Sequence, residues 1–198
     1  FHIRMYYMVL LEGSKGGGVP KRIRTLMLRQ GFIFTAGKEY RSGDWADAKV
    51  HDTHLTTTDG IIEFPRDFPS SGCVVDAQGV FQQMKDCLCA TSRVCAPTFR
   101  IYKESDSAFE VFGVDFMVTS EGKVVLIEVN FKPGYGAMKK KPSMLYNNVY
   151  NFILASQPDF KLDTNDKLKH LSAVWLYDSA ATALNSLSLS DSSTQHVG

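Results

Sequence analysis

The sequence has 198 residues, 44% of them hydrophobic, so it is long enough to fill one core and too short for two ordinary domains. Its 22 basic and 21 acidic side chains give a formal net charge of +1, which provides no global field to recruit nucleic acid or an anionic membrane. No apolar run reaches the roughly 20 residues that a membrane-spanning helix needs. We therefore expect neither a nucleic-acid partner nor a membrane span.

The cysteine content indicates the compartment. Four cysteines are few for this length, and no secretory leader precedes them. Both observations are typical of a reducing environment, so we expect a cytoplasmic protein that is not secreted.

The first predicted element is a central strand over residues 1–11, which are rich in aromatic and aliphatic side chains. The glycine cluster that follows lacks the residue order of a phosphate-binding loop, so we expect a flexible hairpin connection there. A return strand is predicted over residues 31–35. Because the apolar run begins at Phe1 without a polar lead-in, the chain is expected to be the C-terminal portion of a longer domain.

Two helices and a tail are predicted farther along the chain. Residues 76–95 have apolar side chains near a 3.6-residue period, and so do residues 138–154. The buried stripe of the first helix is predicted to contain Val80, Met84, Cys87, Leu88 and Val94. The serine-rich residues 178–198 are predicted to be disordered, which leaves residues 1–177 as the domain.

Between the helices, two strand-like runs over residues 108–118 and 123–130 predict a β-hairpin. The simplest connection is a two-residue turn at Glu121 and Gly122. Side chains alternate between the two faces of a hairpin. One face is predicted to be hydrophobic core made by Phe112, Val114, Phe116, Val118, Val125, Ile127 and Val129.

The other face of the hairpin carries polar side chains. In the predicted register Asp115 lies opposite Glu128, and Gly113 lies opposite Asn130. Opposed carboxylates repel one another, and a bound cation would remove that cost. Mg²⁺ suits carboxylate and amide oxygens, and Gly113 is expected to leave room for a metal or a phosphate.

Two further features of this face bear on the interpretation. Met117 pairs with Leu126 in the predicted register, and together they can form an apolar floor for an adenine ring. The alternative is an ordinary hairpin whose acidic residues face solvent. A one-residue slip would keep Glu128 beside Asn130 but turn Asp115 away.

The runs FEVFGVDFMV and VVLIEVNFKPG resemble the closing motif of ATP-grasp ligases, most closely that of the tubulin tyrosine ligase-like family. Three other segments resemble the family in the same order: FHIRMYYMV, GFIFTAGKEY and HLTTT. Several matches in order are more specific than any one of them.

The resemblance implies a role for each matching residue. It implies a magnesium site made by Asp115, Glu128 and Asn130. It implies that Arg4 steadies the γ-phosphate of ATP and the acyl phosphate formed from it, and that His54 and Thr56 lie near the nucleotide or the substrate. From the residues alone, Arg4 can equally be a strand arginine paired with a carboxylate, and His54 a structural histidine. The chain departs from the family at Phe34, where the tyrosine ligases have a substrate-binding arginine.

The fold implied is α+β, an ATP-grasp-like antiparallel sheet packed by helices and lacking its N-terminal lobe. The function implied is an ATP- and Mg²⁺-dependent ligase that adds glutamate, glycine or tyrosine to a protein carboxylate. Its partners would be a free amino acid and tubulin or another acidic protein, in the cytoplasm and in association with the cytoskeleton. Two alternatives remain: a degenerate, non-catalytic domain that serves as a structural or binding subunit, and an ATP-grasp enzyme for a small molecule.

Overall fold

The structure is a computed structural model. It describes residues 1–13, 18–53, 61–68, 76–102, 107–131, 133 and 173–180. The predicted helix over residues 138–154 and the residues His54 and Thr56 lie outside this part of the chain. Within the described residues, no helix combines the length and the hydropathy needed to cross a membrane.

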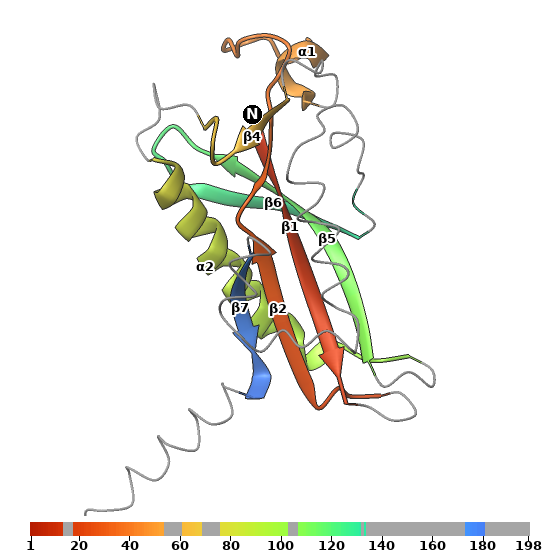
Figure 1. Cartoon of the computed structure of the whole chain (residues 1–198). Helices are drawn as coiled ribbons and strands as arrows, with labels where there is room; N and C mark the ends of the chain where they lie inside the picture. The colour runs from red at the N-terminus through yellow and green to blue at the C-terminus, as the bar shows by residue number, and fades with distance from the viewer. Residues whose placement is uncertain are drawn as a thin grey trace, which may run out of the picture.

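A long central strand, β1 (His2–Glu12), organises the sheet. One of its edges pairs with β5 (Ser107–Val118) from Ile3 to Glu12. Its other edge pairs with β3 (Gly31–Phe34) near its start and with β2 (Arg22–Leu28) near its end (Figure 1). Side chains on both faces of β1 are buried, which explains the near-continuous apolar run in the sequence.

Three further strands complete the sheet. β4 (Ile61–Phe64) pairs with β3, β7 (Ala173–Asp178) with β2, and β6 (Val124–Phe131) with β5. All the pairings are antiparallel, and the described part of the sheet has seven strands. An antiparallel sheet with helices is compatible with the predicted α+β class.

The strand β2, which returns directly after the glycine cluster, was not predicted. β2 pairs back onto β1 next to the connection, whereas the predicted strand over residues 31–35 is β3 and lies beside the start of β1. Arg22 and Arg24 break the apolar pattern of β2, although most of this strand is buried. Because of these two charged residues, the apolar pattern did not identify β2 as a buried strand.

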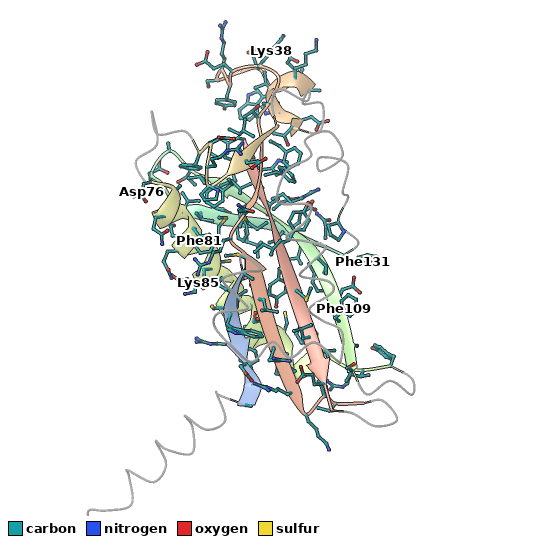
Figure 2. All side chains as sticks on the ribbon, in the orientation of Figure 1. Lys38, Asp76, Phe81, Lys85, Phe109 and Phe131 are labelled. Carbon is teal, nitrogen blue, oxygen red and sulfur yellow. The ribbon has the colours of Figure 1, made fainter. Side chains whose placement is uncertain are left out.

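The predicted helix over residues 76–95 is confirmed as α2 (Ala77–Cys95). The Asp76 carboxylate begins it by accepting a hydrogen bond of 2.7 Å from the Gly79 amide. Phe81, labelled in Figure 2, is one of the residues that α2 buries against the sheet. The buried residues of the helix are Val80, Phe81, Met84, Leu88 and Ser92.

Two members of the predicted stripe behave differently from the others. Val94 is 77% exposed, so its prediction was wrong, and Cys87 is only partly buried. Val94 lies six positions after Leu88, which at 100° per residue turns its side chain well away from the buried face. A short 3-10 helix, η3 (Ala96–Thr98), follows α2 directly.

The connection between β3 and β4 contains the short helix α1 (Ala48–His51). The Asp47 carboxylate accepts from the Lys49 amide at 3.0 Å and pairs with the Lys38 ammonium at 2.6 Å. Lys38 marks this end of the molecule in Figure 2.

The C-terminal strand contains a residue that was predicted to belong to the tail. Asp178 is the last residue of β7 and accepts two hydrogen bonds from the Arg22 guanidinium, at 3.1 and 2.7 Å. Residues 181–198 lie outside the described residues, so the disorder predicted for them stays a prediction.

Buried hydroxyl groups tie α2 to the sheet. The Ser92 hydroxyl donates to the Leu88 carbonyl at 2.7 Å and lies 2.9 Å from both the Tyr7 and the Thr25 hydroxyls. Burial raises the pKa of Tyr7, so this phenol stays protonated and can donate. One serine therefore links α2 to both β1 and β2.

We expect Ser92→Ala to lower the free energy of unfolding by about 1–3 kcal/mol, because the buried Tyr7 and Thr25 hydroxyls lose a shared partner. Urea denaturation of both proteins measures the change. The control is Thr91→Ala, which removes a hydroxyl that donates to the Cys87 carbonyl of the same helix at 2.9 Å. Equal stabilities for the two variants would contradict the proposed link.

Candidate functional site

The hairpin of β5 and β6 has a longer connection than the two-residue turn predicted. The Thr119 amide donates to the Lys123 carbonyl at 2.9 Å, and the Gly122 amide donates to the Thr119 carbonyl at 3.0 Å. Gly122 has a φ of 78°, the left-handed conformation that closes three-residue hairpin loops. Ser120, Glu121 and Gly122 therefore form the loop, and the register of the adjacent pairs shifts by one residue.

A bulge in β6 corrects this shift before the polar residues are reached. Phe116 pairs with Leu126 and Asp115 with Glu128, so Ile127 is the extra residue. The predicted pairing of Asp115 with Glu128 is confirmed, as is that of Gly113 with Asn130.

The predicted pairing of Met117 with Leu126 is wrong. Met117 pairs with Val125, and these two side chains are 49% and 48% exposed. Leu126 packs against the hydrophobic core, because it lies on the side of the bulge where the register differs from the predicted one. An apolar floor on the polar face is therefore made by Met117 and Val125.

The predicted core face of the hairpin is only partly buried. Val114 and Phe116 of β5 are fully buried, whereas Val125, Ile127 and Val129 of β6 are 48%, 49% and 42% exposed. β6 pairs with one strand in the described sheet, so its side chains have fewer neighbours than those of β5. The bulge also moves Val125 to the polar face.

An ion pair between Arg4 and Asp115 forms the centre of the polar face. β1 and β5 place these residues directly opposite each other. The guanidinium Nε donates to Oδ1 at 2.8 Å and Nη2 donates to Oδ2 at 2.6 Å, while the side chains are 14% and 6% exposed. Hydrogen bonding to Asp115 raises the pKa of Arg4 above its ordinary value, so the guanidinium stays charged.

Asn130 connects the two carboxylates. Its Nδ2 donates to Glu128 Oε1 at 2.8 Å and to Asp115 Oδ2 at 3.2 Å. The amide group therefore lies between the two acidic residues, where a shared cation would also lie. Asp115 is buried and Glu128 is exposed, so the cluster extends from the interior to the surface.

The space that was expected above Gly113 is filled by protein atoms. A Cβ at this position would lie 2.8 Å from the Pro133 Cβ and 3.6 Å from the Arg4 Cδ. The expectation that Gly113 makes room for a metal or a phosphate is therefore wrong. Glycine is needed here because the chain after β6 packs against β5 beside Arg4.

His2 and Phe34 complete the site; the resemblance placed position 34 at a substrate-binding position of the family, whereas His2 was assigned no role. The His2 ring stacks on the Phe34 ring, with centroids 4.8 Å apart and planes 12° apart. The Arg4 guanidinium lies 5.8 Å from the centroid of the same phenyl ring. The pairing of β1 with β3 brings these residues together, and the residues of β3 alone do not predict it.

The donor set fits a hard divalent cation. Asp115 and Glu128 supply carboxylate oxygens within reach of one amide group, and rotation of the Asn130 side chain would present its carbonyl oxygen. Each oxygen of Asp115 already accepts from Arg4, and each keeps further acceptor capacity. Among the described residues, no group of three or more His, Cys, Asp or Glu side chains is placed to hold a metal ion. A cation here would thus depend on Asn130 and on ligand oxygens.

The fold and the site define an α+β domain whose antiparallel sheet carries a guanidinium–carboxylate–amide cluster on one face of a hairpin. Residues 69–166 match the model of the tubulin-tyrosine ligase family. The chain is also 28% identical over 160 residues to a probable tubulin–tyrosine ligase of Schizosaccharomyces pombe, an alignment that covers 78% of this chain and 37% of that protein. The chain carries a tubulin–tyrosine ligase-like domain, and the predicted resemblance is confirmed at this level.

We expect Asp115→Asn to lower the free energy of unfolding by about 3 kcal/mol, because it leaves the guanidinium of Arg4 without its charge partner in a largely buried place. Glu128→Gln is the control, since this side chain is exposed and its loss of charge should change stability by less than about 0.5 kcal/mol. Urea denaturation without ligands measures both. Similar stabilities for the two variants would show that the ion pair does not support the fold.

Proposed function

We propose that this chain provides the metal- and phosphate-binding part of an ATP- and Mg²⁺-dependent ligase of the tubulin tyrosine ligase type, with an ATP-grasp fold. The reaction would join a free amino acid to a protein carboxylate through an acyl phosphate. The observation that carries the proposal is the polar cluster of Arg4, Asp115, Glu128 and Asn130 on one face of the hairpin. The family match supports a ligase at the level of the family, and it includes the hairpin.

Arg4 has the geometry to bind an anion while it remains paired. Two of its nitrogens, Nε and Nη2, donate to Asp115, and within the described residues no acceptor takes the Nη1 donors. A guanidinium binds phosphate oxygens through such an edge. In the proposed reaction Arg4 holds the terminal phosphate and then the acyl phosphate, whose negative charge it offsets.

The acidic residues would have a separate role in binding the metal. Asp115, Glu128 and the Asn130 carbonyl oxygen would hold Mg²⁺, which when bound neutralises phosphate charge during phosphoryl transfer. The exposed Met117 and Val125 lie on the same face and offer an apolar surface for the adenine ring. With the roles divided in this way, the protein contributes position and charge, which dominate catalysis of phosphoryl transfer.

The substrate class follows from the family and not from the cluster. The chain spans 37% of the length of the relative it matches, and the cluster by itself identifies neither an acceptor protein nor an amino acid. We propose tubulin or another acidic protein as the acceptor, a free amino acid as the donor, and a cytoplasmic, cytoskeleton-associated location.

A second candidate function is a non-catalytic binding or structural domain. The hydrogen bonds that Asp115 accepts from Arg4 and Asn130 favour this candidate. The guanidinium of Arg4 already balances the charge of this carboxylate, so the carboxylate needs no metal ion. Phe34 favours this candidate too, since this residue lies against Arg4 where the resemblance implies an arginine. Ligand binding distinguishes the two candidates.

We expect Mg²⁺ and ATP together to stabilise the protein by about 2.7 kcal/mol at 100 times the dissociation constant, and neither alone to do so fully. A thermal-shift titration measures this. Glu128→Gln should weaken the Mg²⁺-dependent shift without changing the ligand-free melting temperature, because this residue is exposed and separate from the ion pair.

A matched control is Glu110→Gln, an exposed residue of β5 outside the cluster, which should leave the titration unchanged. A protein that shows no shift with Mg²⁺ and ATP is the non-catalytic domain. If a shift is seen, release of ADP in the presence of tubulin and each candidate amino acid tests the reaction itself.

A further inference from the structure

His2 lies between Asp115 and the connection that contains α1. The residue is 7% exposed, and its ring is held flat against Phe34. Its Nδ1 lies 2.7 Å from the Thr53 hydroxyl, and its Nε2 lies 3.7 Å from Asp115 Oδ1. A single ring therefore lies between Thr53 of this connection and the buried carboxylate.

The hydroxyl of Thr53 can determine which ring nitrogen carries the proton. If Thr53 donates to Nδ1, the proton of the neutral ring is on Nε2, the nitrogen that faces Asp115. The stack on Phe34 fixes the ring plane, so the direction of this N–H is fixed as well. The N–H then faces the Asp115 oxygen to which Arg4 Nε donates, at 3.7 Å, a separation longer than a hydrogen bond at which the N–H dipole still acts on the carboxylate.

We propose that His2 is a positioning residue for Asp115, and that Thr53 selects its Nε2–H tautomer. His2 thereby orients the carboxylate that would bind the cation, and it couples Thr53, in the connection between β3 and β4, to the site. The part that concerns the cation rests on the proposed function, whereas the tautomer and its dependence on Thr53 do not.

The geometry favours positioning over a simple packing role. A histidine that only filled space against Phe34 would need neither a hydroxyl partner on one nitrogen nor a carboxylate beside the other. Groups that orient a metal-binding side chain commonly change metal affinity by 10–100-fold when they are removed. The same order of effect is expected from removing the Nε2 of His2.

The first experiment reads the tautomer directly in the full chain without ligands. Long-range ¹H–¹⁵N NMR correlations of the ring, recorded near pH 8.5 where an ordinary imidazole is neutral, identify the protonated nitrogen. The Nε2–H form is expected for His2, and Thr53→Val should shift the ring toward the other tautomer. A ring that carries its proton on Nδ1, or on both nitrogens, would overturn the proposal.

The second experiment compares two replacements of His2. In His2→Asn the amide reaches the position of Nδ1 only, and in His2→Gln it reaches the position of Nε2. We expect His2→Asn to raise the apparent dissociation constant for Mg²⁺, measured by thermal shift at fixed ATP, by about tenfold. His2→Gln should stay within about twofold of the unchanged protein.

Replacements of Thr53 provide the matched controls. Thr53→Val should weaken Mg²⁺ binding as His2→Asn does, and Thr53→Ser should restore it, because serine keeps the hydroxyl. Adding Thr53→Val to His2→Gln should cause no further loss, since glutamine has no tautomer to select. A packing role predicts instead that affinity follows the ligand-free melting temperature of each variant, and that result would refute the positioning role.

The two proposals fail in different ways. If the unchanged protein binds no Mg²⁺ and ATP, the proposed function fails, while the NMR measurement still decides the role of Thr53. If the unchanged protein binds them and His2→Asn and Thr53→Val bind Mg²⁺ equally well, the proposed function stands and the positioning role of His2 is refuted.

Discussion

The ion pair of Arg4 and Asp115 is the constraint on which the site depends. Its partners come from β1 and β5, strands that are joined over almost the whole length of β1. A shift of one residue between these strands would turn one partner to the opposite face and leave a charge in the core. The ion pair therefore forms only when β1 and β5 pair in this register. Packing by α2 on the other face of the sheet reinforces it.

The sequence contained enough information to predict the hairpin and the pairing of its polar residues. Alternation identified the faces of β5, and the apolar period identified α2. The partner of Arg4 was beyond this reasoning, because the two residues of the pair are 111 positions apart and long-range strand pairing leaves no local pattern. The same limit explains why His2 was missed. β2 was missed for another reason, since its arginines broke the apolar pattern of a largely buried strand.

The opposed carboxylates predicted a bound cation, and the structure supplies a positive charge from a third strand. Arg4 provides the positive charge for Asp115, and the Asn130 amide reduces the repulsion between Asp115 and Glu128. An acidic pair in a hairpin is thus no sufficient sign of a metal. The amide is informative in another way, because the same side chain can donate to both carboxylates or present its oxygen to a cation. A cluster of this kind can exist in two states of ligation with little movement of the backbone.

The bulge at Ile127 also divides the hairpin into two parts that pair in different registers. The loop of Ser120, Glu121 and Gly122 adds one residue to the connection, and the bulge absorbs it before Asp115 is reached. The tip and the polar cluster therefore each have their own register. A residue can be added to or removed from the loop without changing the pairing of the cluster, provided that the bulge is gained or lost at the same time. Among related chains, insertions and deletions in this hairpin should then occur as coupled pairs.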